Sequence, residues 1–231
     1  MNLKSTLRRL KRQFFGNPPK VKKDLSLKTE FHGSEYGGWT IEADSLSASS
    51  IVYSFGIGCD VSFDTSLMDR YGCTVNGFDP TPQVVSWVAS QNLDSRFRFH
   101  PLALSDKPGQ ITFFEPDNPN HISHSKHPSS ADGKKIEVEC SDLASIASDL
   151  GHSKIDLIKM DIEGFEYDVL NEAFFGMPVR QLLVEFHHFL PQCSNAMTEG
   201  TIDLLRKNGF ELFYIASNFC EYSFINRNLD Q

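Results

Sequence analysis

The residues best able to do chemistry in this chain follow short apolar runs. Asp161 and Glu163 come directly after the run 155–160, and His187 follows the run 181–186. A histidine has an ordinary pKa of ~6.5 and can therefore take up a proton near neutrality. We accordingly take His187 as the candidate base, and Glu163 as the second candidate or as the group that orients the substrate or the base. For both residues the alternative is structural, a helix-capping carboxylate and a hydrogen-bonded core histidine.

A turn rich in glycine forms the second candidate site. The apolar, β-forming run 51–55 stops at Gly56-Ile57-Gly58 and is followed by apolar residues at helical spacing. Gly56 and Gly58 let the backbone turn tightly and approach a ligand without a Cβ in the way. Asp79 comes about 20 residues later, where a second-strand carboxylate can receive a ribose diol. Together these features predict a nucleoside cofactor.

The residues after the turn favour a ligand that carries positive charge. In the dinucleotide motif G-x-G-x-x-G a third glycine packs beside the pyrophosphate. That place holds Val61 here, and Asp60 stands where the anion would sit. A carboxylate repels a phosphate but attracts the ammonium and sulfonium groups of S-adenosylmethionine. The alternatives are a nicotinamide-dependent oxidoreductase on the same kind of sheet and a nucleoside-binding module without activity.

The elements that position these residues alternate between strands and helices. Such alternation predicts an α/β fold with a parallel sheet and helical crossovers, in which ligands bind beyond the carboxyl ends of the strands. Residues 211–216 and 220–225 are expected to close the sheet as an antiparallel pair. We expect strands at 51–55, 74–78, 97–104, 136–140, 155–160 and 181–186, and helices at 63–71, 82–91, 141–150, 165–175 and 198–207.

Five segments resemble the FkbM-type S-adenosylmethionine-dependent methyltransferases, over roughly residues 36–215. Their most specific part is KMDIEGFEYDVL at 159–170, and the opening motif has Gly-Ile-Gly where the commoner family opening has Gly-Ala-Asn. The resemblance implies a class I (Rossmann-like) methyltransferase fold, with a doubly wound, mostly parallel seven-stranded sheet and an antiparallel last strand. The segments are 52–64, 78–82, 103–106, 155–170 and 183–187.

The same resemblance implies roles for the residues at the strand ends, with S-adenosylmethionine as the cofactor. It implies O-methylation of a hydroxyl on a small-molecule or glycan acceptor, such as a sugar or another small metabolite. No metal is expected, although Asp161, Glu163 and His187 could instead hold a divalent ion. The implied cofactor contacts are Phe55, Gly56, Gly58 and Asp60 along the methionine moiety, Asp79 and Pro80 at the ribose, Leu104 at the adenine and Asp161 closing the site.

Composition and charge exclude several classes of protein. The chain has 231 residues, of which 40% are hydrophobic, and its net charge of −8 makes nucleic acid a poor partner. No apolar stretch approaches the ~20 residues of a membrane span. The five cysteines form no C-x-x-C pair, which favours a reducing compartment and a cytoplasmic location. The oligomeric state has no signature in the sequence.

The chain is expected to divide into a tail and one domain. Residues 1–23 contain Lys and Arg but no acid and form a basic amphipathic tail, either a contact for a membrane surface or a protein, or a solvated terminus. Residues 24–231 form a single methyltransferase domain. The polar stretch 116–135 is expected to be a loop that covers the acceptor, rather than a zinc site built from its histidines, His121, His124 and His127.

Overall fold

The structure is a computed structural model that describes residues 18–114 and 135–230. The amphipathic part of the expected tail lies outside these ranges. So does the loop expected at 116–135, apart from Lys135, and with it the three histidines. Among the helices in the two ranges, none is both long enough and apolar enough to cross a membrane.

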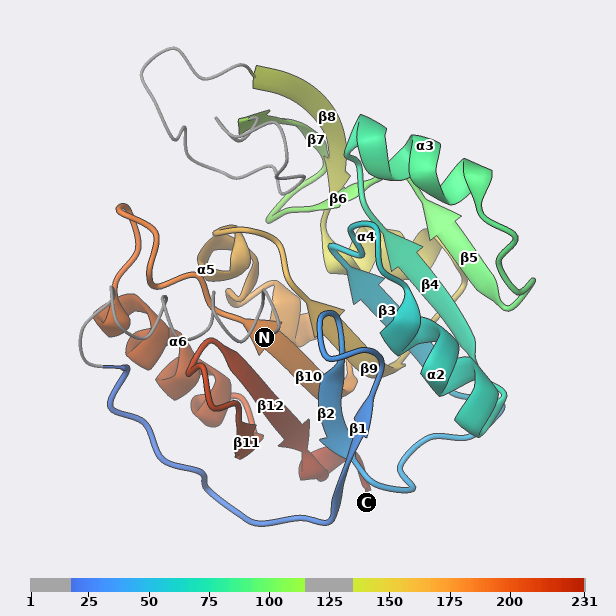
Figure 1. The fold of residues 1–231 in the computed structure, drawn as a ribbon. Helices are drawn as coiled ribbons and strands as arrows, with labels where there is room; N and C mark the ends of the chain where they lie inside the picture. Colours follow the sequence, from blue (N-terminus) through green and yellow to red (C-terminus); the bar gives the residue numbers. More distant parts are fainter. Residues whose placement is uncertain (1–17, 115–134, 231) are drawn as a thin grey trace.

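A seven-stranded sheet forms the centre of the molecule (Figure 1). The strands β5, β4, β3, β9 and β10 lie side by side in that order, and each pairs in parallel with its neighbour. Beyond them, β12 runs antiparallel between β10 and β11. The expected α/β fold is therefore confirmed, as is the antiparallel last strand. In spatial order the strands are β11 (Phe210–Ile215), β12 (Glu221–Asn226), β10 (Val179–Glu185), β9 (Ile155–Met160), β3 (Ile51–Phe55), β4 (Thr74–Phe78) and β5 (Phe97–His100).

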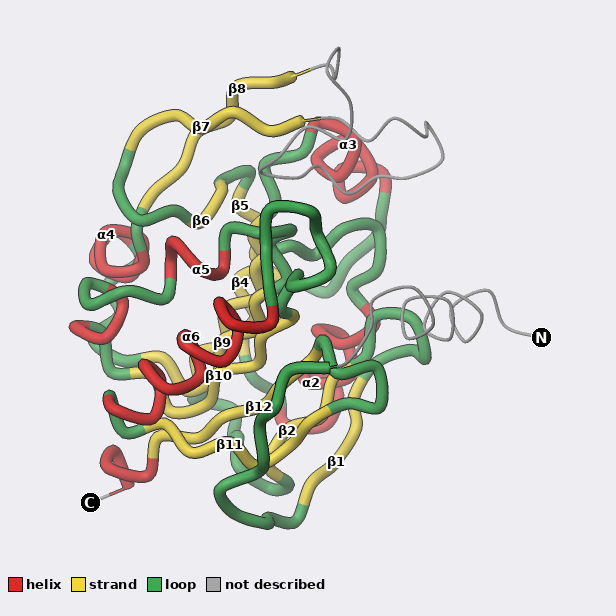
Figure 2. Tube along the Cα trace, turned by 90° about the vertical axis from the view of Figure 1, so that its left-hand side faces the viewer, coloured by secondary structure: helices red, strands yellow, loops and turns green. Residues whose placement is uncertain are grey.

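Helices cover both faces of this sheet, and each face has its own apolar core (Figure 2). One face packs against α2 (Ser62–Tyr71), α3 (Pro82–Ser90) and the hairpin of β1 (Thr29–His32) and β2 (Trp39–Glu42). The other face packs against α4 (Leu143–Asp149), α5 (Glu166–Val169) and α6 (Asn195–Lys207). The alternation of buried strands and amphipathic helices read from the sequence produces this three-layer arrangement.

Local signals explain where several helices begin and end. The carboxylate of Asp142 accepts a hydrogen bond from the Ser145 amide and caps α4, and Ser194 caps α6 in the same way through the Met197 amide. Gly72 ends α2 in the left-handed conformation, which a glycine adopts without steric cost. α6 therefore begins three residues before the expected start at 198, because the cap lies at 194.

Two expected elements are divided in the structure. The strand expected at 97–104 is interrupted at Pro101, which has no N–H for a ladder, and continues as β6 (Ala103–Leu104) in a second sheet with β8 (Lys135–Ser141) and β7 (Gly109–Phe114). The helix expected at 165–175 is only α5, followed by a 3₁₀ turn (Phe174–Gly176). The Asn171 side chain accounts for this break, because it donates to the Asp168 carbonyl and accepts from the Ala173 amide.

The residues just before the expected domain boundary pack against the domain. Val21 contacts the apolar core, and the Lys20 amide donates to Glu199 of α6. The Asp24 amide donates to the Leu212 carbonyl, and the Asp24 carboxylate binds Arg206. The part of the chain that the structure describes thus begins on the surface formed by α6 and β11.

Candidate functional site

The structure brings the ends of β3, β4 and β9 together at one edge of the sheet. The Gly56 amide donates to the Phe78 carbonyl at 2.9 Å, and the Asp161 amide donates to the Phe55 carbonyl at 3.1 Å. Leu104 belongs to the same buried cluster as Phe55 and Phe78. Since β10 neighbours β9, the segment that follows β10 completes this edge with His187.

The glycine turn depends on two backbone conformations that favour glycine. Gly56 has φ +73° and Gly58 has φ +58°. A Cβ on Gly56 would also overlap the carbonyl oxygen of Asp161, so this turn allows no side chain there. The backbone of the turn is therefore pressed against the residue that follows β9, which places the turn beside the acidic run.

Asp79 joins the second strand to the turn. One of its carboxylate oxygens accepts from the Gly58 amide at 3.1 Å, and the other accepts from the Thr81 amide at 3.0 Å. Its side chain is buried, and Pro80, which follows it, is partly exposed. The carboxylate expected to receive the ribose thus also fixes the turn expected to hold the methionine moiety.

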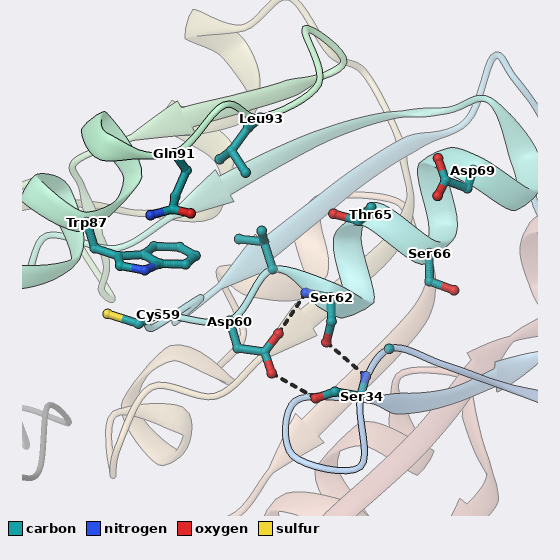
Figure 3. A pocket seen from close by; sticks show the side chains of 12 residues that line it. Ser34, Cys59, Asp60, Ser62, Thr65, Ser66, Asp69, Trp87, Gln91 and Leu93 are labelled. Carbon is teal, nitrogen blue, oxygen red and sulfur yellow. Dashed lines mark hydrogen bonds between the residues drawn. The ribbon is translucent and has the colours of Figure 1, made fainter.

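Asp60 has a structural partner that sequence reasoning missed. Its carboxylate accepts from the Ser62 amide and from the Ser34 hydroxyl, both at 2.8 Å, and the Ser34 amide donates to the Ser62 hydroxyl (Figure 3). Ser34 lies in the loop between β1 and β2, a hairpin that was not predicted because its strands have four residues each. The sequence signal for this loop was its set of glycines, Gly33, Gly37 and Gly38.

A hollow of 670 Å³ lies beside the turn, between α2 and α3 (Figure 3). It shares Cys59 and Asp60 with the turn, but Asp79, Leu104 and Asp161 are not in its wall. The hollow therefore adjoins the strand-end edge without being that edge. Its lining is Gly33, Ser34, Cys59, Asp60, Val61, Ser62, Thr65, Ser66, Asp69, Trp87, Gln91 and Leu93.

His187 stands at the centre of three carboxylates. Its side chain is 2% exposed, Nδ1 lies 2.7 Å from Glu166 Oε1, and Nε2 lies 3.2 Å from Glu163 Oε2 and 3.6 Å from Asp161 Oδ1. Glu166 is fully buried and also accepts from the Gly164 amide. Through its contact with Nδ1, Glu166 orients the imidazole ring. Sequence spacing could not reveal that contact between α5 and the end of β10.

These carboxylates change the protonation of His187. Burial opposes the charged ring, but Glu166 and Glu163 outweigh it and raise the pKa of His187 well above its ordinary value of 6.5. The ring is therefore protonated on both nitrogens, and positively charged, near neutrality. The choice of His187 as the base rested on an ordinary pKa, and that premise does not hold in the folded protein.

The two acids on the solvent side of His187 are less buried than the ring. The Asp161 side chain is 30% exposed and that of Glu163 is 28% exposed. Burial, and then the charge of Glu185, raise the pKa of Asp161 to about 7. Glu163 has φ +52°, a conformation that is strained for a residue other than glycine and that occurs often at functional sites.

The same three residues present ligand atoms that could hold a divalent cation. One ligand atom each from Asp161, Glu163 and His187 lie within 4.8 Å of one another. A ring nitrogen and two carboxylate oxygens suit several divalent metals, and the contact of Glu166 with Nδ1 would fix the metal-binding tautomer. A metal and the proton on Nε2 would compete for one position, so a metal could bind only to the ring without that proton.

Comparison with known proteins gives matches over most of the chain. Residues 50–212 match the family described as "Methyltransferase FkbM domain". Human "Probable methyltransferase-like protein 24" is 29% identical over 143 residues, which cover 61% of this chain and 33% of that protein. The rat protein of the same name is 28% identical over 154 residues, which cover 65% and 36%. The chain thus spans about a third of the length of these curated relatives.

Among solved structures, the chain is similar to the fibrillarin pre-rRNA processing protein of Methanococcus jannaschii. The TM-score is 0.47 and the sequence identity is 8%, with 90% of this chain and 87% of that chain covered.

Proposed function

Because the chain belongs to the FkbM methyltransferase family, we propose that it transfers a methyl group from S-adenosylmethionine to a hydroxyl oxygen of a sugar or another small metabolite. The observation that carries the proposal is the extent of the family match. Residues 50–212 contain β3, β4, β9 and β10, whose ends build the candidate site. The match favours a methyl donor over the nicotinamide-dependent oxidoreductase that the sequence alone left open.

The proposed cofactor site uses the turn and the acid that fixes it. We place the methionine moiety along the turn and the ribose hydroxyls at Asp79, whose carboxylate has lone pairs beyond the two that bind amides. The adenine then lies toward Leu104. The proposed contacts are Phe55, Gly56, Gly58, Asp60, Asp79, Pro80, Leu104 and Asp161.

The cofactor supplies an electrophilic methyl carbon, so this chain must align the hydroxyl with it and accept the hydroxyl proton. Both nitrogens of the buried His187 ring are already protonated, so the ring cannot accept another proton. The Glu163 carboxylate is partly exposed and lies within 3.2 Å of that ring. We therefore assign the proton acceptor to Glu163. His187 becomes the positioning residue, holding Glu163 on one side and being held by Glu166 on the other.

Isothermal titration with S-adenosylhomocysteine, and with NADH as the control ligand, tests the proposed cofactor. We expect saturable binding of S-adenosylhomocysteine alone. Asp79→Asn should weaken it at least about tenfold, because a charge-assisted hydrogen bond to the ribose is lost. Asn keeps one oxygen that can accept from the Gly58 amide and loses the acceptor for the Thr81 amide, whereas Ala loses both acceptors. Binding of NADH without binding of S-adenosylhomocysteine would overturn the proposal.

Methyl transfer itself is tested with S-adenosylmethionine labelled in the methyl group and a panel of hydroxylated sugars and small metabolites. Label should appear as an ether, stable to mild base, in at least one acceptor. Label found only on an amine or a carboxylate would refute methylation of a hydroxyl and leave the methyltransferase assignment intact.

A further inference from the structure

Lys159 places a buried ammonium group directly behind the glycine turn. The residue lies on β9 with 6% of its surface exposed. Its Nζ donates to the Gly56 carbonyl at 2.5 Å and to the Phe55 carbonyl at 3.3 Å. Its hydrogen bonds thus go to the backbone of the turn rather than to a carboxylate of the neighbouring acidic run.

The surroundings of Lys159 hold the ammonium in this position. The ring of Trp39 lies with its centroid 5.7 Å from Nζ, on the hairpin side. Asp64 of α2 is buried nearby, and burial raises its pKa to about 6 although the charge of Lys159 opposes the rise. Burying an ammonium group is costly unless it is paired and hydrogen-bonded, and here the two carbonyls and Asp64 supply those partners.

The hydrogen bond to Gly56 fixes the direction of the next amide. A trans peptide is planar, with its C=O and N–H pointing in opposite directions, and no cis peptide is found in the described chain. Because the Gly56 carbonyl points at Lys159, the Ile57 N–H points away from it. The amides on either side are already used, by Phe78 and by Asp79. For the Ile57 N–H, residues 18–114 and 135–230 supply no hydrogen-bond acceptor.

The charges around the Ile57 N–H indicate which kind of ligand group it suits. The edge of the sheet carries the carboxylates of Asp60, Asp79, Asp161 and Glu163, which suit the cationic groups of an amino-acid sulfonium but repel its carboxylate. An amide polarised by an ammonium on the far side of the same peptide is a stronger donor than an ordinary one. It is therefore suited to bind an anionic group in an otherwise acidic place.

We propose that Lys159 is a positioning residue that fixes the Gly56–Ile57 peptide so that the Ile57 N–H binds the carboxylate of the amino-acid part of the cofactor. This inference rests on the proposed function. It assigns to one backbone amide the recognition of the only anionic group that S-adenosylhomocysteine and S-adenosylmethionine contain.

The test compares two ligands that differ in that carboxylate. 5′-Methylthioadenosine has the same nucleoside and sulfur but lacks the amino-acid part. In a titration, Lys159→Met should lower the affinity for S-adenosylhomocysteine at least tenfold and change the affinity for methylthioadenosine less than twofold. The matched control is Lys154→Met, at a lysine whose side chain is 69% exposed and whose Nζ lies 3.6 Å from Asp156 Oδ1. It should leave both affinities unchanged.

A purely structural role for Lys159 gives a different pattern. An equal loss of affinity for both ligands would mean that the whole turn loses its conformation. Unchanged affinity for both ligands would mean that the ammonium has no effect on binding of the carboxylate. Either result overturns the inference while the proposed function stands. If the unsubstituted protein binds methylthioadenosine but not S-adenosylhomocysteine, both the inference and the proposed cofactor fail.

A measurement without a variant covers the case in which Lys159→Met does not fold. In ¹⁵N-labelled unsubstituted protein, the Ile57 amide proton should move downfield on saturation with S-adenosylhomocysteine and stay in place with methylthioadenosine. An Ile57 amide that shifts equally with both ligands, or with neither, contradicts the inference.

Discussion

The candidate site has two halves that are held in place by different forces. In the turn half, Gly56, Gly58 and Asp79 are fixed by backbone amides and carbonyls. In the acidic half, Glu163 and His187 are fixed by charge, with carboxylates on both nitrogens of the ring. Substitutions in the turn half should therefore reduce stability and cofactor binding together. Substitutions in the acidic half should reduce turnover and leave the cofactor bound.

The largest effect is expected at the turn. Gly56→Ala places a methyl group against the Asp161 carbonyl at φ +73°, and should lower the free energy of unfolding by about 4 kcal/mol and abolish binding of S-adenosylhomocysteine. Urea denaturation and titration measure the two losses. Gly151→Ala is the control, because Gly151 has the same φ with open space around its Cβ position and should cost only about 1 kcal/mol. Similar losses for both variants would show that the contact with Asp161 is unimportant.

Beneath the turn, Asp64 should make stability depend on pH. Its pKa is raised from 3.8 to about 6, so its contribution to stability is present below pH 3.8 and is lost as the pH rises through about 6. The difference in unfolding free energy between the unsubstituted protein and Asp64→Asn should change by about 3 kcal/mol over that window, in favour of Asn at the higher pH.

Denaturation at a series of pH values measures this difference, and Asp94→Asn provides its control. Arg96 lowers the pKa of Asp94 to about 2, so the contribution of Asp94 is lost only as the pH falls from 3.8 through about 2. Between pH 4 and 6, Asp94→Asn should follow the unsubstituted protein. A flat difference for Asp64→Asn in this window would mean that Asp64 is ionised beside Lys159 throughout.

In the acidic half, Glu163→Gln removes the proposed proton acceptor. Turnover with an acceptor found in the screen should fall about a hundredfold, which is about 2.7 kcal/mol of transition-state stabilisation, while the affinity for S-adenosylhomocysteine changes less than about twofold. Glu172→Gln, at an exposed position after α5, is the control and should keep full turnover. Loss of cofactor affinity in Glu163→Gln would erase the distinction between the two halves.

The smallest effect is expected where the hairpin loop meets the turn half. Ser34→Ala removes the hydrogen bond to Asp60 and should cost about 1 kcal/mol of stability with a modest loss of cofactor affinity. Thermal denaturation compares it with Ser49→Ala, whose exposed hydroxyl contacts that of Ser47. If Ser34→Ala abolishes cofactor binding, the hairpin belongs to the site rather than supporting it.

The two halves also differ in how far the sequence could predict them. The turn half follows from residue type and spacing, because only glycine tolerates the φ of Gly56 and the distance from Gly56 to Asp79 is that of one strand–helix–strand unit. The residues of the acidic half were also found from their positions after β9 and β10. Their protonation was not, since it depends on the 2.7 Å contact between Glu166 and His187, which no spacing along the chain predicts.

The remaining differences in the fold have local causes. The β1–β2 hairpin is too short to give a periodic signal, and so Ser34 was missed as the partner of Asp60. The run 97–104 reads as one strand because apolar residues recur on both sides of Pro101, and only the second sheet shows where it divides.

The position of β12 has a consequence for how the protein is made. β10, which leads to His187, pairs with β9 on one side and with β12 on the other. Because β12 is the last strand of the sheet to leave the ribosome, β10 has an unpaired, apolar edge from the time it emerges until β12 emerges. Such an edge can pair with another nascent chain. Aggregation during synthesis, rather than instability of the finished domain, is therefore the hazard that β12 removes.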